Sequence, residues 1–583
     1  MILDKINSQK DLKTLSLADM KILAQESRNL IINKVNTISG HMGPNLGFVE
    51  PTIAMHYVFD SPKDKFIFDV SHQCYTHKIL TGRKDGYTDS ENYFKYTGYT
   101  APEESEHDLF KVGHTSTSVS LACGVAKARD LKGERYNVVA VLGDGSLSGG
   151  EALEGLNNAS VLDSNIIIIL NDNEMSIAEN HGGLYKNLKE LRETNGTAEC
   201  NMFKALGFKY YYLEEGNDIE KLVDLFKKVK DIDCPVILHM HTEKGLGCET
   251  ANKNKEFGHY MMPGTVGVDV NKISFPENDF QAETLNFIRE KVKTDSRAIV
   301  VNAGTPGVFR FTKDVRAEFG KQYTDVGIAE EHAVAYSSAL AKSGAKPILN
   351  FMSSFVQRTY DQLSQDLCLN NSPVMMLIYW GGITAADATH LCTFDMSMMG
   401  NIPNLVYLAP TTKEEHIAMM NFAYNQNEYP VAIRVPSCDM VSTGKSDDTD
   451  YSKLNKYKLM EEGQDVAIIG LGNFYWLGKE IKDYLKTTSG IDASLINPCY
   501  ITGVDEELLD GLKSNHKVVI TLEDGELDGG FGEKITRYFA KSDIKVLNYG
   551  SHKEFTDRVS LDELYKKYHL KKELIAKDLQ KLL

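Results

Sequence analysis

The sequence has few features of a membrane, secreted or nucleic-acid-binding protein. No apolar run approaches the roughly 18 residues that a membrane span needs, and residues 1–25 contain early acidic residues and no uninterrupted apolar core, so we expect no signal peptide. The nine cysteines include no Cys-x-x-Cys pair, which indicates neither a disulfide framework nor a zinc cluster. The 81 acidic residues outnumber the 64 basic ones, giving a formal net charge of −17, which argues against a nucleic-acid or anionic-membrane surface. We expect a cytoplasmic enzyme.

The length and composition predict a globular protein of several domains. The chain has 583 residues, of which 42% are hydrophobic and 25% charged, and it is too long to fold around one core. Alternating strand and helix patterns predict an α/β fold with three doubly wound domains and mostly parallel sheets. The predicted domains are 1–262, 298–441 and 465–583, and the predicted linkers between them are 263–297 and 442–464.

One stretch, residues 137–176, has the pattern of a strand–helix–strand unit. Residues 138–142 form a short apolar run typical of a buried strand, and Gly143-Asp144-Gly145 ends it in a sharp turn. The spacing predicts a helix over 151–160 whose apolar face has four members: Ala152, Leu153, Leu156 and Ala159. A second strand over 166–170 precedes Asn171-Asp172-Asn173. A right-handed crossover makes the two strands parallel, so both polar turns lie at one edge of the sheet.

The two polar turns predict a magnesium and diphosphate site. A Gly-Asp-Gly turn alone most often marks only a change of chain direction, but Asp144 and Asn173 follow neighbouring strands and can meet at one ion. An acid, an amide and backbone carbonyls are oxygen ligands that suit Mg²⁺. The flanking glycines allow close approach to a diphosphate, and the following helix directs its amino end at the anion.

Other candidate residues are ambiguous when taken alone. His41, His72 and His114 each lie after a strand or before a helix, where the loops of doubly wound folds line a ligand crevice, although loop histidines are more often solvated or capping residues. Glu330 begins a predicted helix, where a carboxylate is most often a cap. Phe355, at helical spacing, is more often a core residue.

The motif formed by Gly143-Asp144-Gly145 and Asn171-Asp172-Asn173 resembles that of a known family. Gly-Asp-Gly followed about thirty residues later by Asn is similar to the thiamine-diphosphate motif, and the Asn171-Asp172-Asn173-Glu174-Met175-Ser176 wording is closest to the 1-deoxy-D-xylulose-5-phosphate synthase family of transketolase-like enzymes. The resemblance covers essentially the whole chain. It implies a transketolase-like thiamine-diphosphate-binding fold, thiamine diphosphate and Mg²⁺ as cofactors, and a homodimer. The implied reaction is the decarboxylative transfer from pyruvate to glyceraldehyde 3-phosphate that serves isoprenoid and thiamine biosynthesis.

The resemblance also implies roles for individual residues. The implied catalytic residues are Glu330, His41, His72 and His390. The implied metal ligands are Asp144, Asn173 and Met175. The implied cofactor contacts are His72, Gly113, His114, Thr115, Gly145, Ser146, Asn173, Ile177, Lys244, Ile328, Glu330 and Phe355. The implied substrate contacts are Arg358, Arg434, Asp387 and His259, with Arg434 on the phosphate of the acceptor.

The chain departs from the family pattern at several places. The family usually has Asp-Arg-Ala-Gly where this chain has Tyr379-Trp380-Gly381-Gly382, and the turn before His390 is one residue shorter. The lost arginine is a phosphate contact in the family, and Met352 replaces a tyrosine. The loop after Ser176 is much shorter than in the family, which puts a lid function in doubt.

Two other functions therefore stay open. The first is a transketolase-type or other acyloin-forming enzyme with a different donor or acceptor, because Trp380 and Met352 alter the acceptor pocket. A substrate screen that follows carbon dioxide release separates it from the synthase. The second is a catalytically silent relative that acts as a scaffold, which absence of cofactor binding would favour.

Overall fold

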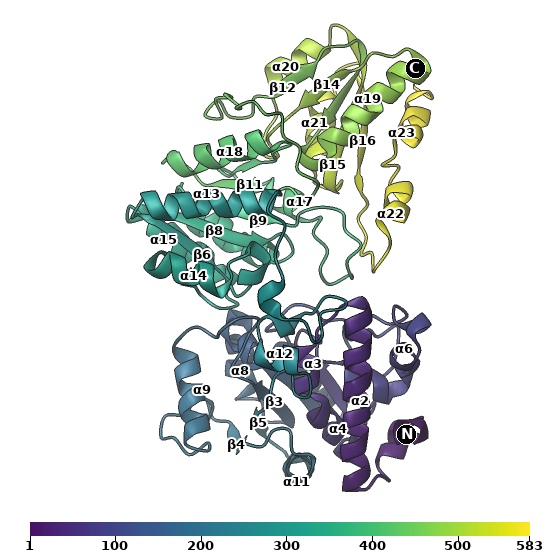
Figure 1. Ribbon diagram of the computed structural model, residues 1–583, viewed down its shortest axis with the longest axis vertical. Coiled ribbons are helices and arrows are strands. Elements are labelled where there is room, and N and C mark those ends of the chain that lie inside the picture. The colour runs from purple at the N-terminus through teal and green to yellow at the C-terminus, as the bar shows by residue number, and fades with distance from the viewer. Residues whose placement is uncertain (583) are drawn as a thin grey trace. The chain divides into compact units, whose positions relative to one another are not determined.

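A computed structural model describes residues 1–582 of the chain and divides it into two compact units (Figure 1). The first unit is Met1–Ser274 with Gly327–Ala329, and the second is Phe275–Val326 with Glu330–Leu583. None of the helices within residues 1–582 combines the length and the apolar character needed to cross a membrane.

The first unit is built on a five-stranded parallel sheet in the order β1-β2-β3-β5-β4. Its strands are β1 (Lys65–Phe68), β2 (Val138–Gly143), β3 (Ile166–Asp172), β4 (Lys209–Leu213) and β5 (Pro235–His241). Its longer helices are α2 (Leu17–Ile38), α4 (Val49–Val58), α7 (Ser118–Leu131), α8 (Gly150–Ala159), α9 (Gly183–Glu193) and α11 (Ile219–Val229).

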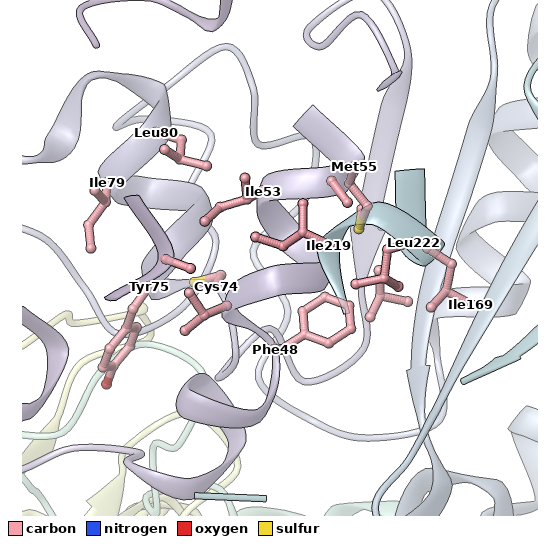
Figure 2. Packing of buried hydrophobic residues seen from close by; sticks show 14 of the residues in the cluster. Phe48, Ile53, Met55, Cys74, Tyr75, Ile79, Leu80, Ile169, Ile219 and Leu222 are labelled. Carbon is pink, nitrogen blue, oxygen red and sulfur yellow. The ribbon is translucent and has the colours of Figure 1, made fainter. Parts of the chain in front are cut away.

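Helices cover both faces of this sheet, because alternate strand residues enter two separate cores. Ile167 and Ile169 of β3 pack with α2, α4 and α11, whereas Ile166, Ile168 and Leu170 pack with α7, α8 and α9. Figure 2 shows the first of these cores, where Ile169 lies beside Ile219 and Leu222. Strands buried on both faces need continuous apolar sequence, which is the pattern from which they were predicted.

The second unit contains two further sheets. A six-stranded parallel sheet has the order β10-β11-β9-β8-β6-β7, and its strands are β6 (Ala298–Asn302), β7 (Tyr323–Asp325), β8 (Lys346–Met352), β9 (Met375–Tyr379), β10 (Val406–Leu408) and β11 (Val431–Arg434). A five-stranded sheet has the order β12-β14-β13-β15-β16, and its strands are β12 (Lys458–Glu461), β13 (Asp465–Gly470), β14 (Ser494–Asn497), β15 (His516–Glu526) and β16 (Lys545–Ser551). Only β12 in this last sheet is antiparallel, so the predicted α/β class with mostly parallel sheets is confirmed.

The two sheets of the second unit share one hydrophobic core. Ile378 of β9 and Ile469 of β13 belong to the same buried cluster. The helices around these sheets include α13 (Phe280–Thr294), α15 (Glu330–Lys342), α17 (Asp395–Met399), α18 (Lys413–Asn425), α19 (Tyr475–Ser489) and α21 (Phe531–Phe539). A shared core explains why residues from both predicted C-terminal domains form one compact unit.

Several local predictions differ from the structure. Residues 280–294, assigned to a linker, form α13, which buries Phe280 and Ile288; residues 458–461, also assigned to a linker, form the edge strand β12. β1 ends at Phe68, shortly before Val70 and Ser71, whose positive φ angles of 57° and 62° are incompatible with a strand. Leu153 of α8 is 40% exposed because it is rotated about 100° from Ala152 on the helix. The domain boundaries themselves stay a prediction.

Candidate functional site

The polar loops of the first unit meet at the carboxyl edge of its sheet. Gly143 and Asn171 are register partners on adjacent parallel strands, so Asp144 and Asp172 are the next residues on each strand. A Cβ atom added at Gly145 would lie 2.9 Å from the Cα of Ser176, so only glycine allows this close approach of the two loops. The contact that the sequence predicted between the Asp144 turn and the loop after β3 is therefore present.

The Asp144 side chain is buried beside a second acid. Burial, followed by the charge of Asp172, raises the pKa of Asp144 to about 8. The Asn180 side chain donates from Nδ2 to Asp144 Oδ2 at 2.7 Å. A buried carboxyl group with a raised pKa needs a positive partner to be held ionised, and a divalent cation is such a partner.

Several buried oxygens around this turn have no hydrogen-bond partner within residues 1–582. They are Asn173 Oδ1, Ser176 Oγ and Asn180 Oδ1. Buried polar atoms are normally paired, and unpaired amide and hydroxyl oxygens beside a carboxylate match the donor set of Mg²⁺. The residues present thus fit the magnesium ion that the sequence predicted. No group of three His, Cys, Asp or Glu residues in this described range forms a metal site.

Asp172 is held by a network of its own. It accepts hydrogen bonds from His239 Nε2 at 2.8 Å, Arg192 Nη1 at 2.5 Å and the Glu174 amide at 3.1 Å. Burial opposes its ionisation, but His239 and Arg192 outweigh burial and lower the pKa of Asp172. Asp172 therefore stays charged and fixes the loop that carries Asn173.

Lys244 reaches the same edge from the loop after β5. Its side chain is 2% exposed, and its Nζ donates to the carbonyl of Ser176 at 2.5 Å. Burial lowers the pKa of Lys244 to about 7, against the opposing charge of Asp144. The predicted cofactor contact is thus a buried cation in contact with the loop between Asn173 and Ile177.

Three of the predicted histidines form one cluster. The ring centroids of His41 and His72 lie 4.9 Å apart, those of His41 and His259 5.5 Å, and those of His72 and His259 5.3 Å. Asn45 joins their loops, because its Nδ2 donates to the carbonyls of His41 at 2.7 Å and His72 at 2.6 Å. Burial, then the charge of Lys244, holds the pKa of His259 well below its usual range. The three imidazole rings therefore pack against one another.

The loop with Gly113, His114 and Thr115 is fixed by Asp69. The Asp69 carboxylate accepts from the amides of Ser116 at 2.8 Å and Ser118 at 3.0 Å. Ser116 in turn donates from its hydroxyl to the carbonyl of Ser146 at 2.9 Å. This bond connects the His114 loop to the turn after β2.

The other predicted cofactor contacts of the first unit surround the same turn. Gly145 and Ser146 belong to the short helix Asp144–Ser148, and Met175 and Ile177 lie in the loop after β3, where Met175 pairs with Glu179. The amide of Ile328 donates to Ser148 Oγ at 2.9 Å. The structure thus brings these predicted contacts to one edge of the first sheet, but it does not test their roles.

In the second unit Glu330 begins α15 and is 2% exposed. Its Oε2 has no hydrogen-bond partner within residues 1–582. Burial raises the pKa of Glu330 to about 7, and Arg358 opposes the shift. A buried glutamate with a pKa near neutrality is suited to holding or accepting a proton.

Phe355, His390 and Asp387 form a second group in this unit. The Phe355 and His390 rings meet edge to face at 5.8 Å, and His390 Nδ1 lies 3.5 Å from Asp387 Oδ1. Burial opposes ionisation of Asp387, but hydrogen bonds from His390 and Thr389 outweigh it and lower the pKa of Asp387 to about 2. The shortened turn before His390 therefore holds the His390 imidazole in one orientation, through Asp387 and Thr389.

Arg434, a predicted substrate contact, is held by an acid and a backbone carbonyl. It donates to both carboxylate oxygens of Asp395 and, from Nη2, to the carbonyl of Asp524 at 2.9 Å, and it is 5% exposed. The family resemblance implied a phosphate contact for Arg434, which is the last residue of β11 and also the ion-pair partner of Asp395. Its partner lies 39 residues earlier in the chain, which local sequence did not reveal.

The altered segment Tyr379–Gly382 packs directly on this pair. A Cβ at Gly381 would lie 2.4 Å from Arg434 Nε, and one at Gly382 would lie 2.3 Å from Asp524 Oδ2. Trp380 has a φ of 61° and is 43% exposed. The two glycines thus let the backbone approach Arg434 and Asp524 closely, while Trp380 is partly exposed.

Sequence reasoning missed the residues that hold these loops. They are Asn45, Asp69, Asn180, Tyr185 and Arg192. Asn45, Asp69 and Asn180 lie three or four residues from a predicted site residue, which is a weak signal in the sequence. Tyr185 and Arg192 lie on α9, where the sequence offers no such signal.

Known families match this chain along nearly its full length. The model described as 1-deoxy-D-xylulose-5-phosphate synthase matches residues 3–200 and 194–242, the transketolase pyrimidine-binding domain matches 282–439, and the transketolase C-terminal domain matches 455–575. The 1-deoxy-D-xylulose-5-phosphate synthase of Dictyoglomus thermophilum is 37% identical, with 91% of this chain and 90% of that protein covered. That of Clostridium tetani is 36% identical, with 100% and 99% covered.

A solved transketolase from Campylobacter jejuni overlaps at a TM-score of 0.45 and 16% identity, over 96% of this chain and 98% of that chain, which is too low to support a statement about the site. The family match is carried by the sequence relatives, which are more than 30% identical over nearly the whole chain. The chain is thus a transferase with the transketolase-like α/β fold, and it belongs to the 1-deoxy-D-xylulose-5-phosphate synthase family.

Proposed function

We propose that this chain is a 1-deoxy-D-xylulose-5-phosphate synthase that uses thiamine diphosphate and Mg²⁺. It joins the two-carbon unit left after pyruvate loses carbon dioxide to the aldehyde of glyceraldehyde 3-phosphate. The observation that carries the proposal is the buried carboxyl group of Glu330, whose Oε2 has no partner within residues 1–582. When bound, thiamine diphosphate supplies the electron sink for decarboxylation and carbon–carbon bond formation.

The first unit supplies the metal and diphosphate ligands in this proposal. Asp144, Asn173 and the Met175 carbonyl hold Mg²⁺, and the unpaired oxygens of Asn173 and Ser176 support this assignment. The backbone around Gly145 and Ser146, the loop with Gly113, His114 and Thr115, and the buried Lys244 suit the anionic diphosphate. Ile177 and Ile328 supply apolar contacts.

The second unit supplies the acid and the aromatic contact. Glu330 hydrogen-bonds the aminopyrimidine ring and holds a proton there, for which a pKa of about 7 is suited. Phe355 stacks on the same ring. His41, His72 and His390 move protons to and from the substrates, because imidazole changes charge near neutral pH, and His259 contacts substrate. Arg358 and Asp387 orient substrate.

A second function is favoured by one specific observation. Trp380 occupies the place of a family arginine, and Arg434 is paired with Asp395. One of the phosphate contacts that the resemblance implied is therefore missing, and the other is engaged in an ion pair. A related transferase with an uncharged or differently charged aldehyde acceptor is the alternative.

A substrate screen tests the proposed function. The enzyme is loaded with thiamine diphosphate and Mg²⁺, and carbon dioxide release from pyruvate is followed with glyceraldehyde 3-phosphate, with glyceraldehyde and without acceptor. Release stimulated mainly by glyceraldehyde 3-phosphate supports the synthase. Stimulation by glyceraldehyde alone supports the alternative acceptor, and transfer from ketose donors without carbon dioxide supports a transketolase. Absence of cofactor binding by calorimetry supports the scaffold function.

The cellular setting belongs to the same proposal. We infer a homodimer in the cytoplasm that supplies isoprenoid and thiamine biosynthesis with its sugar phosphate product, and that binds neither nucleic acid nor membranes. The family resemblance, the nine unpaired cysteines and the net negative charge support this setting. Size-exclusion chromatography with light scattering tests the dimer.

A further inference from the structure

The short segment after the metal loop is bonded back onto the metal site. Asn180 Nδ2 donates to Asp144 Oδ2 at 2.7 Å. The Tyr185 hydroxyl lies 3.1 Å from the carbonyl of Asp144 and 3.3 Å from that of Gly145. Arg192 donates to Asp172 at 2.5 Å and to Glu174 at 3.2 Å. Three side chains of one segment thus contact both loops that carry the proposed metal ligands.

The segment is also packed rather than open. Residues 183–193 form α9, which buries Leu188 and Leu191 in the core on one face of the first sheet. Leu184 and Tyr185 pack partly buried against the same core. The positions of Tyr185 and Arg192 are therefore fixed by the apolar side of α9, and these residues reach the site from a rigid element.

We propose that Asn180 and Tyr185 are positioning residues for the cation, a role that rests on the proposed metal site at Asp144. Asn180 fixes one oxygen of the Asp144 carboxylate and so orients the other toward the ion. Tyr185 fixes the backbone of the same turn through its carbonyls. Arg192 holds the far end of the helix against Asp172. A carboxylate ligand whose second oxygen is hydrogen-bonded is the usual way in which outer residues orient a metal ligand.

A second observation supports a ligand at this point. The Oδ1 atom of Asn180 is buried and has no partner within residues 1–582, although its Nδ2 is bonded. A buried amide oxygen next to an acid is costly unless it coordinates a cation or accepts a hydrogen bond from water bound to that cation. The amide is thus placed to contact both Asp144 and the hydration shell of the ion.

Calorimetry tests this positioning role by measuring Mg²⁺ binding, without measuring enzymatic turnover. Mg²⁺ is titrated into wild-type and variant protein in the presence of excess thiamine diphosphate at one fixed concentration. Asn180→Ala is expected to weaken Mg²⁺ binding by about 10- to 100-fold, the usual effect of losing an outer-shell partner. Tyr185→Phe, which keeps the packed ring, is expected to weaken it several-fold. The control is Asn187→Ala, because Asn187 lies on the same helix and bonds the carbonyl of Cys200 instead of either loop.

Three outcomes overturn the proposal. If Asn180→Ala and Tyr185→Phe both bind Mg²⁺ as tightly as wild type, neither residue positions the metal ligand. An equal loss in Asn187→Ala shows a general effect of disturbing α9. If wild-type protein binds neither Mg²⁺ nor thiamine diphosphate, the proposed function fails as well, which distinguishes that failure from the first two. Should Asn180→Ala not fold by circular dichroism, Tyr185→Phe alone decides.

Discussion

Arg434 and Asp395 form a two-point ion pair, with Nε 2.8 Å from Oδ2 and Nη2 3.1 Å from Oδ1. The side chain of Asp395 is fully buried and that of Arg434 is 5% exposed. Asp395, followed by Asp524, outweighs burial and raises the pKa of Arg434. This arginine therefore contributes to the stability of the fold around the turn at Gly381.

The first prediction concerns this pair. Arg434→Met leaves the buried Asp395 carboxylate without its cationic partner, with the Tyr407 hydroxyl still donating to it, and loss of one member of a buried pair costs about 3–5 kcal/mol. We expect a marked fall in the apparent melting temperature. Asp395→Asn combined with Arg434→Met should recover part of the loss in a double-mutant cycle. A stable single variant that changed only the KM of the acceptor would restore the phosphate-binding role.

The second prediction concerns Trp380. If the missing arginine sets acceptor choice, Trp380→Arg should lower the KM of glyceraldehyde 3-phosphate and leave that of glyceraldehyde unchanged, because the added guanidinium bonds only a phosphate. Trp380→Gln is the matched control, since it removes the ring without adding charge. An equal change with both acceptors would argue that the indole acts through its shape.

The third prediction concerns Glu330. Loss of a positioned acid typically costs about 10²–10⁴-fold in rate, so Glu330→Gln should lower kcat by this order with cofactors saturating. Glu331→Gln, the adjacent and less buried glutamate, is the control and should retain near-normal turnover. Near-normal kcat in Glu330→Gln would remove Glu330 from the mechanism.

The fourth prediction follows from the raised pKa of Glu330. Its pKa is near 4.5 in unfolded chain and about 7 when buried, so the folded state binds more protons between these values. Stability therefore falls as pH rises from about 4.5 to about 7, by at most about 3 kcal/mol from this group. Glu330→Gln lacks this dependence. Cofactor-free wild type and variant should melt at similar temperatures at pH 4.5, and the variant should be the more stable at pH 8.

The fifth prediction concerns the metal loop. Asp144→Asn should abolish the mutual strengthening of Mg²⁺ and thiamine diphosphate binding in calorimetry, because it removes the only proposed ionised ligand. Asp163→Asn, an exposed acid near the opposite end of β3, is the control. Removing Mg²⁺ from wild type with a chelator should release thiamine diphosphate. If Mg²⁺ and thiamine diphosphate bound independently of each other in wild type, the assignment of Asp144 and Asn173 as metal ligands would be contradicted.

The sequence by itself determined the elements and the chemistry of the central motif. Apolar runs such as Ile166–Leu170 predict buried parallel strands, because hydrophobic patterning is a local property of the chain. The glycines around Asp144 likewise predict a close turn. Only the tertiary structure decided which side chains support that turn. Asn180 meets Asp144 across 36 residues, Asp69 meets Ser116 across 47, and Arg434 meets Asp395 across 39. Such contacts depend on how distant elements pack, and no local pattern in the sequence encodes that packing.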